Sequence, residues 1–207
     1  LTARGYTFIP NGIALSRFRF DPKQREAARA ELGCSDGVLI GNVGRLCYQK
    51  NQEFLLDILP TILTREPRAR LLLVGEGADE EKLRSRAAAL NIADRVIFYG
   101  VTGGVERLLW AMDVFAFPSF YEGMPNTIIE AQATGLPCVL ADTITKEADI
   151  TGLLTYLPLG DAERWANEIA GKCACVRRDT SEELKAAGYD INEVCKEFVQ
   201  MIFGEDA

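Results

Sequence analysis

The sequence predicts an α/β protein built on a doubly wound parallel sheet, and three observations support this fold class. Short apolar, β-branched segments alternate along the chain with longer amphipathic segments, which is the pattern of parallel strands connected by helices. The short segments are apolar at nearly every position, as expected for a sheet that is buried on both faces. The chain has 207 residues, of which 48% are hydrophobic and 26% charged, enough to bury the core of one domain of this class or of two small ones.

Each expected strand is a short apolar run that ends in glycine, serine or alanine. The five runs are Val38–Gly44, Arg70–Gly75, Arg95–Gly100, Asp113–Ser119 and Pro137–Ala141. Each expected helix begins near a polar or small residue, and several end at glycine or before proline, as helix capping requires. These helices are Arg25–Leu32, Asn51–Arg65, Ala78–Leu90, Gly104–Ala111, Asn126–Thr134, Asp161–Lys172, Ser181–Ala187 and Asn192–Phe203. The β signal weakens after Ala141, and residues 1–21 are expected to form an extended connection into a domain that comprises residues 22–207.

Composition and charge exclude several classes of function. The formal net charge is -7 and the isoelectric point is about 4.8, so neither nucleic acid nor an anionic membrane surface is the expected partner. No apolar run reaches the roughly 18 residues of a membrane span, and no signal peptide is recognisable. The six cysteines lack the spacing of a secreted disulfide framework, which indicates a reducing, cytosolic compartment. Cys173 and Cys175 are interpreted as structural thiols, because no second pair and no histidine completes a zinc site.

The loops that follow the strands are the places to look for a ligand, because open parallel sheets bind ligands beyond the carboxyl ends of their strands. In the first such loop, Arg45 follows Gly44 directly and Lys50 stands at the start of the next helix. A guanidinium and an ammonium beside a helix N-terminus form an anion site that suits a diphosphate. The alternative is that both are solvated surface cations.

The next two loops are less specific. After Gly75, a strand, a Gly-x-Gly pair and a helix follow in the order of a dinucleotide-binding fingerprint. Glu80 replaces its third glycine, and the carboxylates at 79–81 would repel a pyrophosphate, so this segment is interpreted as a helix cap. Residues 100–104 are small, so their backbone either lies against a flat group such as a nucleobase or forms an ordinary turn.

The fourth loop brings two carboxylates near one helix. Glu122 lies in the loop, and Glu130 lies about one turn into the Asn126–Thr134 helix, which Asn126 can cap. Glu130 has apolar neighbours, and a partly buried, unpaired carboxylate costs on the order of several kcal/mol. A ribose diol would supply two hydroxyl donors to it, and Glu122 could reach the other end of the same ligand. The alternative is that Glu130 only complements the helix dipole.

The segment EGMPNTIIE, residues 122–130, resembles the E-x7-E motif of the family 4 retaining glycosyltransferases, which have the two-domain GT-B architecture. Six further segments resemble that family in order and spacing: IPNGI, VGRLCYQKN, LLLVGEG, VIFYG, DVFAFPS and GLPCVLA. The resemblance covers roughly Phe8 to Leu159, and the variants of bacterial capsular and exopolysaccharide biosynthesis look most similar. It implies that the chain is the Rossmann-like, C-terminal half of a GT-B fold.

The resemblance also implies a role for each matching residue. Arg45 and Lys50 match the catalytic pair that holds the donor diphosphate and stabilises the departing nucleotide. Glu122 matches the catalytic carboxylate near the donor sugar, and Glu130 matches the carboxylate that binds ribose hydroxyls. The other donor-binding positions are Gly44, Val101, Gly123, Met124, Pro125, Asn126 and Thr127. The expected donor is a nucleotide sugar, UDP by family resemblance. No cofactor and no metal are expected, since cations and helix amides can stabilise the leaving group and the sequence has no D-x-D motif.

The chain departs from the family pattern because it contains no histidine and begins at the connection between domains. We therefore expect an N-terminal acceptor-binding domain to be missing, and the isolated domain to bind donor weakly and transfer little. The acceptor is expected to be a glycan or a lipid-linked saccharide, with the full-length enzyme in the cytoplasm or peripherally at the inner membrane face. Two alternatives stay open: a UDP-sugar 2-epimerase of the same architecture, and a non-catalytic nucleotide-binding or interaction module.

Overall fold

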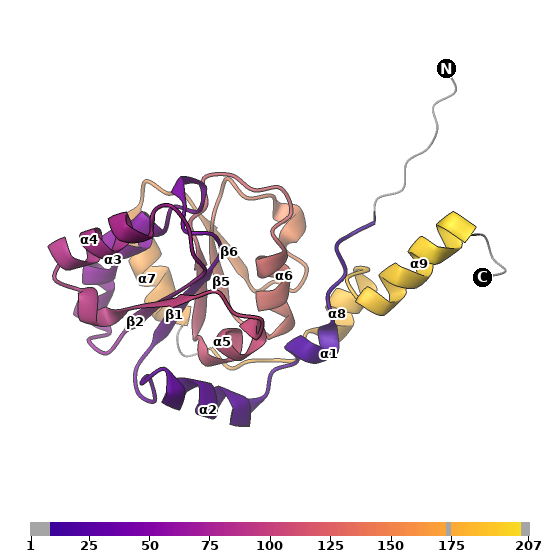
Figure 1. The fold of residues 1–207 in the computed structure, drawn as a ribbon, viewed down its shortest axis with the longest axis horizontal. Coiled ribbons are helices and arrows are strands. Elements are labelled where there is room, and N and C mark those ends of the chain that lie inside the picture. The colour runs from indigo at the N-terminus through magenta and orange to yellow at the C-terminus, as the bar shows by residue number, and fades with distance from the viewer. Residues whose placement is uncertain (1–8, 173–174, 204–207) are drawn as a thin grey trace, which may run out of the picture.

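The computed structural model describes residues 9–172 and 175–203 and shows a six-stranded parallel sheet between two layers of helices (Figure 1). The strand order is β3-β2-β1-β4-β5-β6, and every neighbouring pair is parallel. The strands are β1 Leu39–Val43, β2 Arg70–Val74, β3 Val96–Gly100, β4 Val114–Phe117, β5 Cys138–Ala141 and β6 Leu154–Leu157. The direction of winding reverses between β1 and β4, so the switch point lies there. The predicted fold class is confirmed.

The helices form one group on each face of the sheet, and α8 and α9 lie beside it, next to α1 (Figure 1). On one face, α3 contacts both α4 and α7. On the other face, α2 contacts α5, while α1 contacts α6 and α8. The bounds are α1 Leu15–Phe18, α2 Pro22–Glu31, α3 Gln52–Arg65, α4 Glu80–Ala89, α5 Val105–Ala111, α6 Asn126–Ala133, α7 Ala162–Lys172, α8 Ser181–Ala186 and α9 Ile191–Phe203. Short 3-10 turns occur at Tyr48–Lys50, Ala93–Arg95 and Lys146–Ala148.

The five expected strands and eight expected helices are present, with ends that shift by up to three residues. Two expectations are corrected. A sixth strand, Leu154–Leu157, follows Ala141; only its two end residues are buried, so it lacks the continuous apolar run of the other strands. Within the connection, Leu15–Phe18 is helical rather than extended, because Leu15 and Phe18 turn into the core. Cys173 and residues 1–8 lie outside the described residues, whereas Cys175 is an exposed free thiol.

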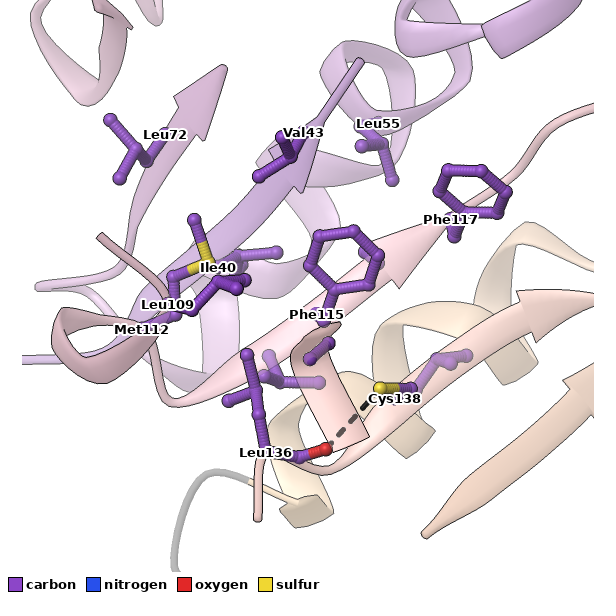
Figure 2. Packing of buried hydrophobic residues seen from close by; sticks show 14 of the residues in the cluster. Ile40, Val43, Leu55, Leu72, Leu109, Met112, Phe115, Phe117, Leu136 and Cys138 are labelled. Atoms are coloured by element: carbon purple, nitrogen blue, oxygen red, sulfur yellow. Dashed lines mark hydrogen bonds between the residues drawn. The ribbon is translucent and has the colours of Figure 1, made fainter. Parts of the chain in front are cut away.

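The core lies on both faces of the central strands. Every residue of β1, β4 and β5 is buried, and Figure 2 shows Phe115 and Phe117 on one face of β4, with ring centroids 5.8 Å apart. Gly41 in β1 leaves the space that Met112 fills, because a Cβ at this position would lie 2.0 Å from Met112 Sδ. This packing holds β1 and β4, the two strands at the switch point, in a fixed register.

Asp113 fixes the opposite, amino ends of the same two strands. Its carboxylate accepts hydrogen bonds from Arg25 at 2.5 Å, from Arg29 at 2.9 Å and from the Leu39 amide at 2.7 Å. Arg25, Arg29 and Arg177 also donate to main-chain carbonyls at the C-terminal end of α5, where the helix dipole is negative. Burial, followed by the charge of Arg25, lowers the pKa of Arg177 to about 9. In this cluster, Arg25 and Arg29 are therefore already paired with Asp113, and Arg177 is already bonded to main-chain carbonyls.

Replacing Asp113 by Asn tests this cluster. The substitution keeps the shape but leaves two largely buried guanidinium groups without their carboxylate, so we expect the free energy of unfolding to fall by about 3 kcal/mol. Urea unfolding followed by circular dichroism measures it. Asp94→Asn is the matched control, because Asp94 pairs with Arg95 while its side chain is 74% exposed, and it should change stability by less than about 1 kcal/mol. Equal effects of the two substitutions would contradict the assignment.

Candidate functional site

The loops that follow β1, β2 and β3 meet at the carboxyl edge of the sheet. The Gly75 amide donates to the Gly100 carbonyl at 2.8 Å. Gly75 has a φ of +131°, and a Cβ there would lie 2.1 Å from the Gly44 carbonyl oxygen, so only glycine allows these two loops to approach so closely. The three loop glycines thereby form a floor without side chains next to the switch point.

A cavity of about 190 Å³ opens on this floor. It brings together three residues that the sequence singled out, Gly44, Val101 and Glu130, and its other lining residues are uncharged: Val43, Val74, Gly75, Thr102 and Val105. Larger cavities lie against α2 and along α9, but their cationic side chains already have partners. Arg107 pairs with Glu31 in one, Arg25 and Arg29 pair with Asp113 in another, and Lys196 pairs with Glu193 in the third. The smaller cavity is therefore the better candidate for a ligand.

Glu130 is half-buried in this cavity. In the part of the chain that the structure describes, its carboxylate has no hydrogen-bond or ion-pair partner. Burial raises the pKa of Glu130; the charge of Arg17 lowers this pKa, and the charge of Glu106 raises it further. Sequence reasoning missed Arg17 and Glu106, because both are distant in the chain and belong to no motif. The result is a carboxylate that has lost part of its hydration and retains its capacity to accept hydrogen bonds.

Lys50 and Glu122 pair directly, which the sequence did not predict. The Lys50 ammonium lies 2.7 Å from Glu122 Oε1, and the two side chains are only 16% and 9% exposed. The ammonium also lies 4.7 Å from the centroid of the Phe117 ring. Lys50 borders the Glu130 cavity through Gly44, since a Cβ on Gly44 would be 3.2 Å from Lys50 Cε. The ion pair therefore stands at one end of the candidate site, across the switch point.

Backbone and amide hydrogen bonds hold the two loops of this ion pair together. The Phe120 amide donates to the Gln49 carbonyl and the Gln49 side chain to the Tyr121 carbonyl, both at 2.9 Å. Asn51 adopts a left-handed conformation with φ 52°, and its side chain donates to the Pro118 carbonyl at 3.1 Å. The position of Lys50 relative to Glu122 is thus set by the main chain.

Arg45 is exposed, and only its backbone carbonyl is engaged, by the Gln52 side chain at 3.0 Å. Its guanidinium has no partner among residues 9–172 and 175–203. Within the described residues, an unpaired cation therefore directly follows Gly44, which lines the cavity, while the second cation, Lys50, is partly neutralised by Glu122.

The start of α6 differs in detail from the prediction. Pro125, which is buried, occupies the position before the helix, and no side chain among the described residues caps it. The exposed Asn126 instead accepts a hydrogen bond from Asn11 at 3.1 Å. The Ile128 amide donates to the Pro125 carbonyl at 3.0 Å. Gly123 is exposed and Met124 packs partly against the core. The Thr127 amide has no partner in the described part of the chain, so the helix still offers one free donor here.

These groups can bind a ligand that is apolar at one end and anionic at the other. The cavity accepts a flat group, Glu130 accepts hydroxyl donors, and Arg45 and Lys50 attract an anion. Among the described residues, no group of three or more His, Cys, Asp or Glu side chains is arranged to hold a metal ion. No helix within them is long and apolar enough to cross a membrane.

Comparison with known proteins gives consistent matches. Residues 37–172 match the family described as "Glycosyl transferases group 1". The chain is 35% identical over 191 residues to EpsF of Bacillus subtilis, covering 89% of this chain and 50% of EpsF. It is 32% identical over 138 residues to the UDP-Gal:alpha-D-GlcNAc-diphosphoundecaprenol alpha-1,3-galactosyltransferase of Escherichia coli, covering 65% of this chain and 36% of that enzyme.

Among solved structures, Anabaena HepE in complex with UDP has the same fold. The TM-score is 0.78 at 21% identity, and the match covers 95% of this chain and 57% of HepE. The chain spans about half the length, or less, of the relatives with which it was compared.

Glu130→Gln tests the unpaired charge without any ligand. Because the folded-state pKa of Glu130 is raised, its ionised form destabilises the fold above that pKa, and the penalty disappears once the pH falls below the unfolded-state pKa. We expect the substitution to raise the thermal midpoint at pH 7.5 by a few degrees, since ~1 kcal/mol corresponds to about 2–4 °C in a domain of this size. The difference should vanish toward pH 4.

Differential scanning calorimetry measures both effects. Glu197→Gln is the control, because Glu197 is exposed on α9 and should show no change at either pH. A lower midpoint for Glu130→Gln at pH 7.5 would mean that Glu130 is stabilised by partners within the fold.

Proposed function

Because the chain belongs to the group 1 glycosyl transferases, we propose that it binds the nucleotide-sugar donor of a glycosyltransferase that acts on a glycan or a lipid-linked saccharide. One observation carries this proposal. A half-buried carboxylate with no partner among the described residues, Glu130, lines a cavity together with Gly44. Two cations adjoin Gly44: Arg45 follows it in the chain, and the Lys50 side chain lies against it. A nucleoside diphosphate carries a flat base, a ribose diol and a diphosphate in this order. These three parts would match, in turn, the apolar cavity, Glu130 and the two cations.

The parts of the donor are assigned from the chemistry of each residue. The base lies in the apolar cavity against Val101, and the two ribose hydroxyls donate to Glu130. The diphosphate binds Arg45, Lys50 and the amides at the start of α6, where the helix dipole also favours an anion. The sugar extends toward Glu122 and residues 123–127. UDP is the proposed nucleotide, supported by the UDP-dependent E. coli relative and by the UDP complex of HepE.

The proposed chemistry is the departure of the nucleoside diphosphate. The bond between the sugar carbon and the diphosphate oxygen breaks, and negative charge develops on that oxygen. Arg45, Lys50 and the helix amides are positioned to stabilise this charge, so we propose neither a metal nor a cofactor. We further propose retention of configuration and membership of family 4, on the spacing of Glu122 and Glu130 in the E-x7-E pattern.

Lys50 can serve both the carboxylate and the donor. Its ammonium has three hydrogen-bond donors, so it can keep Glu122 at 2.7 Å while it binds a phosphate oxygen. This sharing would place Glu122 beside the phosphate that bears the sugar. Lys50 and Glu122 thus contribute as a pair, and each orients the other.

We propose that the complete transfer reaction is carried out by a longer enzyme of which this chain is one part. In this proposal, residues 22–207 bind the donor, and residues 1–21 connect to an acceptor-binding domain, which is in keeping with relatives about twice as long. The diphosphoundecaprenol acceptor in the name of the E. coli relative supports a lipid-linked acceptor. We therefore propose polysaccharide synthesis at the cytoplasmic membrane face, of the capsular or exopolysaccharide kind.

Titration with UDP tests the donor site. Isothermal calorimetry at pH 7.5 should show binding to the wild-type chain. Arg45→Ala and Glu130→Gln should each weaken it by about 10- to 100-fold, because each removes charge-assisted hydrogen bonds of about 1.5–3 kcal/mol. Arg164→Ala is the control, since Arg164 is an exposed arginine on α7. A wild-type chain that binds none of UDP, GDP and ADP would overturn the proposal.

Glu122→Gln separates the diphosphate from the sugar. Removing the carboxylate frees Lys50 from its ion pair, so the affinity for UDP should rise severalfold, whereas the additional affinity given by a bound hexose should fall. Titrations with UDP and with UDP-glucose, compared between wild type and variant, measure both changes. A loss of UDP affinity in this variant would show that Glu122 is needed to hold Lys50 in place.

A further inference from the structure

The segment that precedes the sheet contacts the candidate donor site at two points. Near its start, the Asn11 side chain donates to Asn126 Oδ1 at 3.1 Å, at the beginning of α6. Farther along, α1 packs against α6, with Leu15 and Phe18 buried. The Trp110 indole donates to the Phe18 carbonyl at 3.2 Å, which ties α1 to α5. α1 is therefore a fixed element next to the helix that bears Glu130.

Arg17 extends from α1 to the wall of the Glu130 cavity. Its guanidinium donates to the Gly103 carbonyl and lies 2.8 Å from Glu106 Oε2. Gly103 stands between Thr102 and Val105, which both line the cavity. Apart from the two chain neighbours of Gly103, no atom of the described residues lies within 4 Å of the place that its Cβ would occupy. The hydrogen bond from Arg17 is thus a direct tie between this loop, residues 101–105, and the rest of the domain.

The same two charged residues act on Glu130. Arg17 approaches it from α1 and Glu106 from α5, and they have opposite effects on its pKa. The cavity residues contributed by β1, β2 and loop 101–105 carry no charge. The charge balance around Glu130 therefore depends on one guanidinium and one carboxylate that are paired with each other.

We propose that Arg17 is a positioning residue of the donor site, which fixes loop 101–105 against α1 and supplies positive charge beside Glu130. This inference rests on the proposed function, because it assumes that the cavity holds a nucleoside. Arg17 does not touch the donor in this proposal. It acts through the loop that packs on the base and through the carboxylate that accepts the ribose hydroxyls.

The proposal has a consequence for the pH dependence of binding. Glu130 binds a diol best when ionised, because both oxygens then accept hydrogen bonds, so affinity falls as the pH drops through its pKa. Removing the cation in Arg17→Gln raises the pKa of Glu130, so the loss of affinity begins at a higher pH. Removing the anion in Glu106→Gln lowers this pKa, so the loss begins at a lower pH.

The experiment is a series of UDP titrations of the full chain between about pH 5 and pH 8. Arg17→Gln should weaken binding about tenfold at pH 7.5 and move the midpoint of the pH profile upward, whereas Glu106→Gln should move it downward. Arg17→Lys should restore the midpoint but not the full affinity, because an ammonium cannot reproduce the forked hydrogen bonds. The terminal phosphate of UDP also titrates near pH 6, but equally for every variant.

Arg19→Gln is the matched control, because Arg19 follows α1 directly, is 72% exposed and pairs with Asp179. It should leave affinity and midpoint unchanged. An Arg17→Gln variant with wild-type affinity overturns the proposal, as does a uniform loss of affinity without a shift of midpoint, which would indicate a structural role alone. If circular dichroism shows that Arg17→Gln is unfolded, the pH profile of Glu106→Gln decides. A downward shift of its midpoint supports the proposal, and an unchanged or raised midpoint overturns it. Failure of the wild type to bind UDP instead refutes the proposed function.

Discussion

The site depends on one constraint: a carboxylate is kept partly out of water with nothing in the described fold to pair with it. Glu130 has this position because α6 packs against the sheet directly beyond the switch point, where the glycine floor of Gly44 and Gly75 leaves a cavity in place of side chains. The charge of Arg17 offsets part of the cost of burying this carboxylate, and hydroxyl donors that enter the cavity would offset more of it. The fold thus maintains a charged acceptor that a ligand can satisfy.

Charged side chains are paired at the amino ends of the central strands and largely unpaired at their carboxyl ends. At the amino ends, Asp113 is paired with Arg25 and Arg29, and helix carbonyls take up the remaining donors. At the carboxyl ends, Arg45 and Glu130 have no partners among the described residues, and Lys50 shares a single carboxylate. A fold can tolerate such unpaired groups when nearby packing contributes enough to the free energy of unfolding. Here the buried strands β1, β4 and β5 supply this packing. Paired charges and the charges left for the proposed ligand thus lie at opposite ends of the same strands.

Patterns within short stretches of sequence predicted the strands and helices that such stretches determine by themselves. The apolar runs of β1 to β5 and the amphipathic helices were predicted because burial on both faces leaves a continuous apolar signal, whereas β6 is buried only at its two end residues and contains Thr155. Gly44, Val101 and Glu130, which line one cavity, could be singled out because their order along the chain follows the order of the loops; their roles stay predictions. The Lys50–Glu122 pair and the contact of Arg17 with loop 101–105 were not found, because residues 72 and 86 positions apart meet only after the chain has folded.

The Lys50–Glu122 pair also bears on which anions the site would refuse. An inorganic phosphate would share the ammonium with a carboxylate that already lies 2.7 Å from it and would bring no hydroxyl to Glu130, so its net attraction to the site would be weaker. A molecule that joins a diphosphate to a diol offsets the competition at one end with hydrogen bonds at the other. Under the proposed function, Glu122 would thereby make the site select a nucleoside diphosphate over inorganic phosphate.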